Sequence, residues 1–209
     1  MRAHTPKTLV LCEGEADMLV MEGLATHAGL AQNLKFQSYN GGSKMRDFLA
    51  NLKVSPEFAR GEYTKILVTR DADASYEAAV QSLKDAILEV FSVIVEAPGN
   101  WADLYSSGKI TSYVVPGSHQ TGMIETLCLN AARAKNPDQF TCLDSFIDCL
   151  EGQWGQRPHE KVRFILWSII AQGVSAQDRL SLKYAIRNLD FNWENVAYSD
   201  LRQLFQSLD

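Results

Sequence analysis

The sequence lacks several features that would assign it quickly to a class of protein. Its four cysteines, Cys12, Cys128, Cys142 and Cys149, form no C-x-x-C pair, which predicts reduced side chains in a cytoplasmic protein. No long apolar run follows the first residues or occurs later in the chain. We therefore expect neither a signal peptide nor a membrane-spanning segment.

The chain also has fewer basic than acidic residues. The chain has 20 Lys and Arg against 25 Asp and Glu, for a formal net charge of −5. A protein with this balance has no overall electrostatic attraction for nucleic acid. A polyanionic substrate would need a local basic strip or a bound metal ion. The 209 residues suffice for one substantial core, or for one domain with a sizeable extension.

The first half of the chain contains a regular alternation of short apolar runs and amphipathic segments. Strands are predicted at residues 8–12, 35–39, 65–70, 92–95 and 110–115, and helices at 15–28, 44–53 and 76–90. Residues 54–63 have the composition of a connecting loop. The alternation predicts an α/β fold, with a Rossmann-like core in which helices flank a mostly parallel sheet.

The pattern changes after a turn at Pro116-Gly117. From residue 123 onward only helical periodicity is present, which predicts helices at 123–134, 140–150, 160–172, 176–188 and 199–208. We therefore expect an α/β domain over residues 1–116. An α-helical C-terminal extension, packed on that domain, would occupy residues 117–209.

Two acidic signatures each follow a predicted strand. Glu13-Gly14-Glu15-Ala16-Asp17 comes after the first strand, and Asp71-Ala72-Asp73 after the third. The carboxyl ends of parallel strands meet at one edge of a sheet, so these carboxylates should converge. Two like charges about 6 Å apart repel by about 3 kcal/mol at an effective dielectric constant near 20. The pattern predicts a bound divalent cation, Mg²⁺ or Mn²⁺, with Glu13, Asp71 and Asp73 as ligands.

Several nearby residues are candidates for supporting roles. Gly14 is expected to let the chain turn tightly from strand to helix, and Gly41 and Gly42 to form the turn after the second strand. Lys44 and Arg70 are candidate phosphate contacts if they border the same crevice, although solvated surface charges are the common alternative. The structural alternative for the acidic residues is helix capping or a favourable interaction with a helix dipole.

The order of these elements resembles the TOPRIM domain of topoisomerases, primases and OLD-family nucleases. The resemblance rests on the two acidic signatures and the Asn40-Gly41-Gly42 turn, and covers residues 7–115. Gly122-Met123-Ile124-Glu125 and residues 161–167 are similar to small stand-alone bacterial TOPRIM-like proteins of uncharacterised function. The resemblance implies that Glu13 acts as general acid or base or as a ligand, and that Asp71 and Asp73 bind the metal. Asp17 and Glu125 would support the site or add a ligand.

The function that the resemblance implies is metal-dependent phosphodiester chemistry on nucleic acid, by a nuclease of bacterial or phage type in genome defence or repair. A homo-oligomer and a partner ATPase or other protein are both open as assemblies. The alternative function is a non-catalytic TOPRIM-like module that binds metal, nucleotide or a partner. Asp71-Ala72-Asp73 also resembles the start of haloacid-dehalogenase-type phosphatases, but those carry the motif on the earliest core strand.

Overall fold

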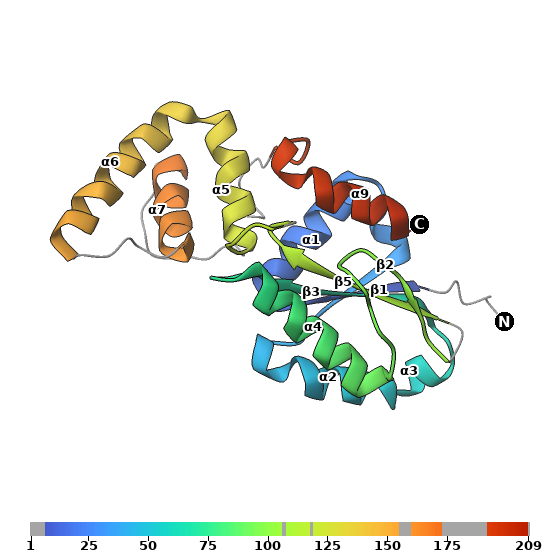
Figure 1. The fold of residues 1–209 in the computed structure, drawn as a ribbon. Helices are drawn as coiled ribbons and strands as arrows, with labels where there is room; N and C mark the ends of the chain where they lie inside the picture. The colour runs from blue at the N-terminus through green and yellow to red at the C-terminus, as the bar shows by residue number, and fades with distance from the viewer. Residues whose placement is uncertain (1–6, 106–107, 118, 155–159, 173–191, 209) are drawn as a thin grey trace.

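The structure is a computed structural model that describes residues 7–105, 108–117, 119–154, 160–172 and 192–208. Its centre is a five-stranded sheet with the order β2-β1-β3-β5-β4 (Figure 1). The strands are β1 (Lys7–Cys12), β2 (Leu34–Ser38), β3 (Tyr63–Asp71), β4 (Ala102–Asp103) and β5 (Lys109–Val115). The first three and β5 pair in parallel, and only the short β4 at the edge is antiparallel. The mixed α/β fold with a mostly parallel sheet is therefore confirmed.

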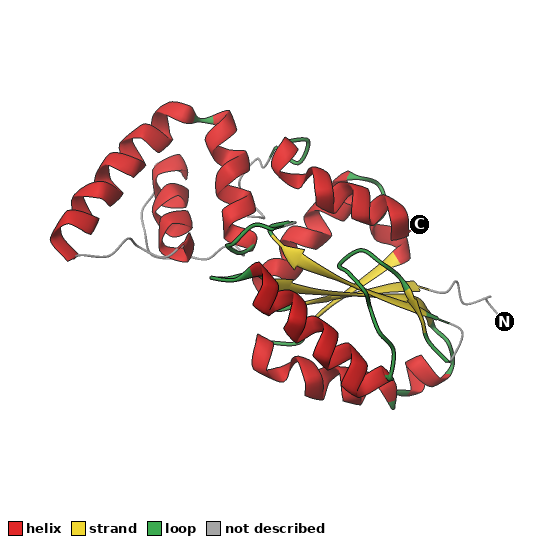
Figure 2. Ribbon diagram, in the orientation of Figure 1, coloured by secondary structure: helices red, strands yellow, loops and turns green. Residues whose placement is uncertain are grey.

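Helices cover both faces of this sheet (Figure 2). In chain order the α-helices of the first half are α1 (Glu15–His27), α2 (Met45–Lys53), α3 (Pro56–Ala59) and α4 (Tyr76–Phe91), with short 3₁₀ turns η1 (Ala31–Asn33) and η2 (Gly42–Lys44). The second half contains α5 (Ile124–Lys135), α6 (Pro137–Trp154), α7 (Glu160–Gln172), η3 (Val196–Tyr198) and α9 (Ser199–Leu208). The helix predicted at 176–188 lies outside the described residues.

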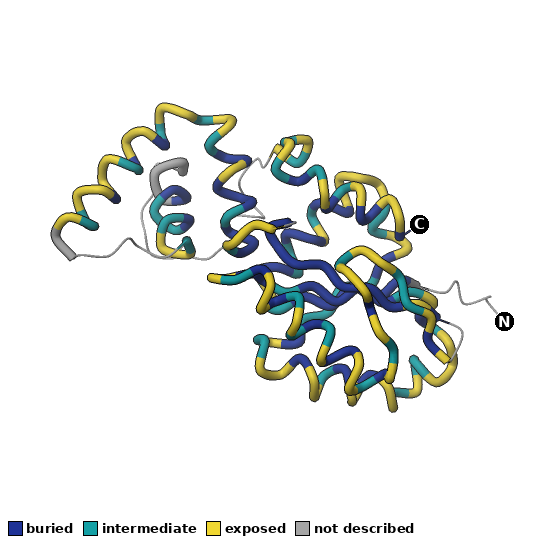
Figure 3. Tube along the Cα trace, in the orientation of Figure 1, coloured by how far each residue is buried: buried dark blue, intermediate teal, exposed yellow. Residues whose placement is uncertain are grey.

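Two hydrophobic clusters hold these layers together, one on each face of the sheet. Both clusters contain residues of β1, β3 and β5; one joins these strands to α1, α5, α6, α7 and α9, and the other joins them to α2 and α4. The central strands β1, β3 and β5 are buried along most of their length (Figure 3) because helices cover both of their faces. The last helix packs through Leu201, Leu204, Phe205 and Leu208, whose spacing places them on one side of a helix.

Two details of the predicted secondary structure are wrong. Residues 92–95 form no strand: Ser92 ends α4 in a left-handed conformation with φ 59°, and the chain continues without sheet pairing. Val95 is buried while Ile94 is 70% exposed, so the apolar residues pack beside the sheet without joining it. Residues 54–63 contain the short helix α3, which begins with Ser55 accepting a hydrogen bond from the N–H of Phe58.

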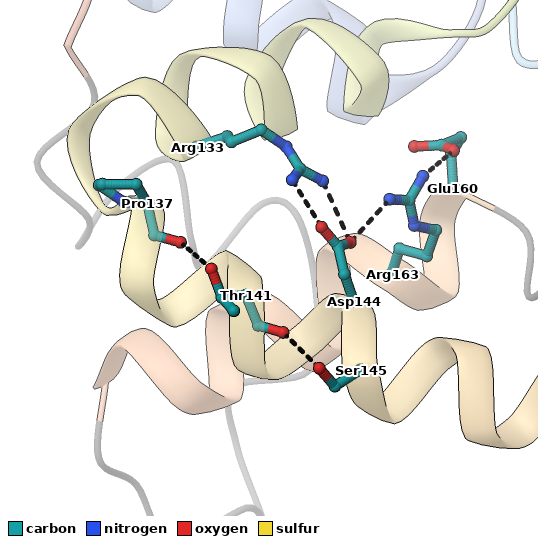
Figure 4. Close-up of polar contacts among 7 residues, drawn as sticks. All are labelled: Arg133, Pro137, Thr141, Asp144, Ser145, Glu160 and Arg163. Atoms are coloured by element: carbon teal, nitrogen blue, oxygen red, sulfur yellow. Dashed lines mark hydrogen bonds and ion pairs between the residues drawn. The ribbon is translucent and has the colours of Figure 1, made fainter.

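The helices of the extension are tied to one another by a network of ion pairs (Figure 4). Arg133 of α5 donates two hydrogen bonds, of 2.6 and 3.1 Å, to the carboxylate of Asp144 in α6. Arg163 of α7 lies 3.4 Å from the same carboxylate and 2.6 Å from Glu160. One carboxylate thus connects three helices. No described helix is both long and apolar enough to cross a bilayer.

Candidate metal centre

The first acidic signature joins three neighbouring strand ends through the carboxylate of Glu13. Glu13 follows β1, and its Oε1 accepts a hydrogen bond of 3.0 Å from the N–H of Gly42, in the turn after β2. Its Oε2 accepts a longer bond of 3.4 Å from the N–H of Asp71, at the end of β3. The side chain therefore lies where the sequence predicts, at the carboxyl edge of the parallel sheet.

The second acidic signature contacts the first turn of α5. Asp71 is only 8% exposed, and its Oδ1 accepts a hydrogen bond of 3.1 Å from the N–H of Ile124, the first residue of α5. Asp73 is joined to Gly122 by two backbone hydrogen bonds of 2.8 Å each. Asp71 therefore caps a helix 53 residues away rather than the helix that follows it; α4 is capped by Ser75.

Four of the candidate carboxylates act electrostatically on the fifth, that of Asp71. Burial raises the pKa of Asp71 well above its usual range, and the nearby carboxylates of Asp17, Glu125, Glu13 and Asp73 raise it further. Asp17 and Glu125 are themselves buried, at 8% and 5% exposure. The structure thus brings together the residues of both signatures and the glutamate of the Gly122-to-Glu125 element.

Asp17 accepts a hydrogen bond from its own loop and interacts electrostatically with Lys161, a residue that the sequence does not indicate as part of the site. Burial raises the pKa of Asp17, while the 2.6 Å hydrogen bond from the N–H of Gly14 opposes that rise. Glu13 raises the pKa of this carboxyl further, and the ammonium group of Lys161 in α7 lowers it. Lys161 lies in the stretch 161–167, which is similar to small TOPRIM-like proteins. Nothing in its spacing indicates the acidic site, because its approach depends on how the extension packs.

The three glycines of the site differ in whether their backbone conformation or their lack of a side chain matters. Gly14 has an extended backbone, with φ −126° and ψ 170°, so the expectation of a glycine-dependent tight turn there is wrong. Gly41 does need glycine, since its φ is 109°. At Gly42 a Cβ would lie 3.1 Å from Nη2 of Arg70 and 3.2 Å from Oε1 of Glu13. The missing side chain allows both groups to approach the turn.

The two predicted phosphate contacts differ in how firmly they are placed. Arg70 is half-buried, and its Nη1 donates a 2.6 Å hydrogen bond to Oγ of Ser82 in α4. Its Nη2 is the group beside Gly42 and Glu13. This guanidinium therefore borders the acidic cluster, by which we mean Glu13, Asp17, Asp71, Asp73 and Glu125. Lys44 is exposed at the end of η2. Arg70 is thus a fixed positive charge, whereas Lys44 lies on the surface.

A magnesium-type ion is the one that these carboxylates could hold, because it needs few protein ligands. Within the described part of the chain, no three His, Cys, Asp or Glu side chains are grouped closely enough to hold a metal ion. Magnesium, however, commonly uses one or two carboxylates and completes its shell with water and phosphate oxygens. The carboxylate of Glu13 lies beside the backbone of Asp71, so these two residues are the ones that could hold such an ion. A buried carboxylate among four others also gains from a cation, because like charges in a low-dielectric site repel strongly.

Comparison with known proteins identifies a family but no activity. A family model with the description "Protein of unknown function (DUF3226)" matches residues 7–208. No curated protein and no solved structure matches the chain. The match runs through both acidic signatures, the helix capped by Asp71 and the last helix.

Proposed function

We propose that this chain, which belongs to the DUF3226 family, binds Mg²⁺ or Mn²⁺ at the acidic cluster and hydrolyses phosphodiester bonds of nucleic acid. The observation that carries the proposal is the burial of Asp71 among four other carboxylates, which raises its pKa well above the usual range. Such strongly shifted groups concentrate at functional sites. The resemblance of the two acidic signatures to the TOPRIM domain supports the same chemistry.

The residues divide the work in this proposal. Asp71 and Glu13 would hold the ion, with Asp73, which is exposed in its loop, as a further ligand through water. When bound, the ion supplies positive charge that stabilises the phosphoryl oxygens as the bond breaks. Glu13, whose carboxylate is oriented by two backbone N–H groups, is the candidate to accept a proton from the attacking water. Arg70 and Lys161 place positive charge at the border of the cluster for the substrate's phosphates.

A second candidate function rests on two specific observations. The described residues contain no preformed group of three metal ligands, and the net charge is −5. Both weigh against a catalytic metal centre that acts on nucleic acid, and so favour a non-catalytic module that binds a metal ion, a nucleotide or a partner. We propose the cytoplasm as the compartment for either function, because all four cysteines are free thiols.

The test combines metal binding and cleavage in the same set of variants. Cleavage of single- and double-stranded DNA and RNA is measured with Mn²⁺, Mg²⁺ or EDTA, and Mn²⁺ binding is measured by calorimetry. Glu13→Gln should lower metal-dependent cleavage by about 10²–10⁴-fold, and Asp71→Asn should weaken Mn²⁺ binding as well. Glu96→Gln, which changes an exposed glutamate away from the site, is the matched control. Undiminished cleavage in both site variants would refute the assignment. Mn²⁺ binding that depends on Asp71, without any cleavage, would establish the binding module instead.

A further inference from the structure

A separate cavity lies at the outer edge of β5, between α9 and the first turn of α4. Its volume is about 420 Å³, and its lining includes Tyr76, Gly99, Tyr113, Val114, Asp200 and Gln203. The edge strand β4 pairs only with Lys109 and Ile110 at the beginning of β5. The later residues of β5 therefore face the cavity. This volume is in the range of sites for small organic ligands.

The hydroxyl group of Tyr113 marks this cavity as a binding site. Tyr113 is only 8% exposed, and among the described residues its buried hydroxyl has no hydrogen-bond partner. A buried polar group without a partner is unfavourable, and native proteins keep few of them. Burial and the neighbouring carboxylate of Asp200 raise the pKa of Tyr113. The hydroxyl is therefore protonated at neutral pH and available as a donor.

A second polar group converges on the same place. Oδ2 of Asp200 and the hydroxyl oxygen of Tyr113 lie 3.3 and 3.5 Å from the point that a Cβ on Gly117 would occupy. Gly117 has φ 153°, which strains any other residue. Because Gly117 has no side chain, both oxygens can lie close to its backbone. The carboxylate and the hydroxyl are thus near enough to each other for one ligand in the cavity to contact both.

The lining specifies the chemistry of the ligand. It contains a carboxylate, a tyrosine hydroxyl, the amide of Gln203 and the ring of Tyr76, and none of its described residues is a lysine or arginine. A phosphate would be repelled by Asp200, whereas a flat group with adjacent N–H donors and a carbonyl acceptor would be satisfied. Guanine offers this combination: its ring N–H and amino group can donate to a carboxylate while its carbonyl accepts from a hydroxyl. Its ring can also stack on an aromatic side chain.

The cavity is also close to the acidic cluster. Val115, two residues after Tyr113, is paired in register with Asp71, and Tyr76 follows Asp73 by three residues at the start of α4. We propose that this cavity binds a nucleobase of the nucleic-acid substrate, with guanine preferred, next to the phosphodiester at the metal centre. The proposal deepens the function given above and rests on it for the identity of the substrate.

The test uses nucleosides without metal, so that its outcome is independent of the metal centre. Binding of guanosine, adenosine and uridine to the full chain is measured by calorimetry in EDTA. Guanosine should bind saturably and about tenfold more tightly than the other two. Tyr113→Phe should weaken guanosine binding about tenfold, which is the loss of one hydrogen bond, and Asp200→Asn should do so at least as strongly. Tyr105→Phe and Asp103→Asn, which change exposed side chains, should bind guanosine as the unaltered protein does.

Stability measurements keep the test decisive. Tyr113→Phe should unfold at a temperature no lower than the unaltered protein, since no residue in the described part of the chain hydrogen-bonds to the Tyr113 hydroxyl. Absence of saturable nucleoside binding, or guanosine binding that is unchanged in both cavity variants, would overturn the proposal. Asp200-dependent binding of N-acetyl-arginine amide with no nucleoside binding would also overturn it, and would assign the cavity to an arginine side chain of a protein. Guanosine binding without any metal-dependent cleavage would reject the proposed nuclease while leaving the base site standing.

Discussion

Replacing Asp71 by asparagine should stabilise the metal-free protein at neutral pH. Asparagine has nearly the same shape, and its side-chain oxygen can still accept the 3.1 Å hydrogen bond from the N–H of Ile124. What the substitution removes is a buried negative charge surrounded by the carboxylates of Asp17, Glu125 and Glu13. A change that leaves the cap in place and removes only the repulsion should increase the free energy of unfolding.

The size of the effect is bounded on both sides. One like-charge pair separated by about 7 Å costs about 2 kcal/mol at an effective dielectric constant near 20. The penalty at pH 7.5 cannot exceed about 5 kcal/mol, because the carboxyl group would take up a proton instead. Since the new amide group must also be accommodated beside the other carboxylates, we expect a gain of about 1–3 kcal/mol. For a chain of this length that corresponds to a rise in melting temperature on the order of 5 °C.

The pH dependence distinguishes a charge effect from a packing effect. Because the pKa of Asp71 is raised in the folded protein, the folded state binds this proton at pH values where the unfolded state has lost it. The penalty is therefore absent at low pH, grows as the pH rises through the unfolded pKa near 3.9, and is complete above the folded pKa. The advantage of Asp71→Asn should be small near pH 4 and larger at pH 7.5.

Urea unfolding in EDTA, followed by tryptophan fluorescence at these two pH values, measures the difference directly. Asp103→Asn removes an exposed carboxylate and should change the free energy of unfolding little at either pH. Added Mn²⁺ should stabilise the unaltered protein more than Asp71→Asn, because an ion that binds only the folded state adds its binding free energy to stability. Equal destabilisation by Asp71→Asn at both pH values would refute the reasoning and leave Asp71 as a helix cap alone.

Three further predictions concern the extension and the glycines. Asp144→Asn should lower the free energy of unfolding by about 1 kcal/mol at neutral pH, since it weakens the paired hydrogen bonds from the partly exposed Arg133. Because Arg133 lowers the pKa of Asp144, this stability is present above about pH 4 and is lost as the pH falls through the folded pKa. Acid titration of both proteins measures this loss. Gly122→Ala should cost about 2–3 kcal/mol in urea unfolding, because φ is 119° and the new Cβ would lie 2.6 Å from Oγ1 of Thr126; a loss below 0.5 kcal/mol would contradict this. Gly42→Ala should weaken Mn²⁺ binding about tenfold, because the new Cβ would lie 3.2 Å from Oε1 of Glu13 and displace that carboxylate. An unchanged affinity in calorimetry would show that Glu13 is not a ligand.

Local signals in the sequence were sufficient for most of the secondary structure. The run before Asp71 contains consecutive apolar and β-branched residues, and it forms β3 because both faces of that strand are buried. The helix at 160–172 has the predicted bounds. The strand predicted at residues 92–95 is wrong because the same signal, an apolar run, reports burial and not strand pairing. An apolar alternation indicates burial, and Val95 is buried, but only the placement of neighbouring strands determines whether the backbone pairs.

The α/β fold and the positions of Glu13 and Asp71 are predictable from the sequence, because parallel strands bring their carboxyl ends to one edge whatever the rest of the chain does. The surroundings of these two residues depend on how distant segments pack together. The hydrogen bond from Ile124 to Asp71, the approach of Lys161 to Asp17 and the approach of Asp200 to Tyr113 all join residues far apart in the chain. No local pattern encodes such contacts, since they follow from how the helical extension packs against the sheet.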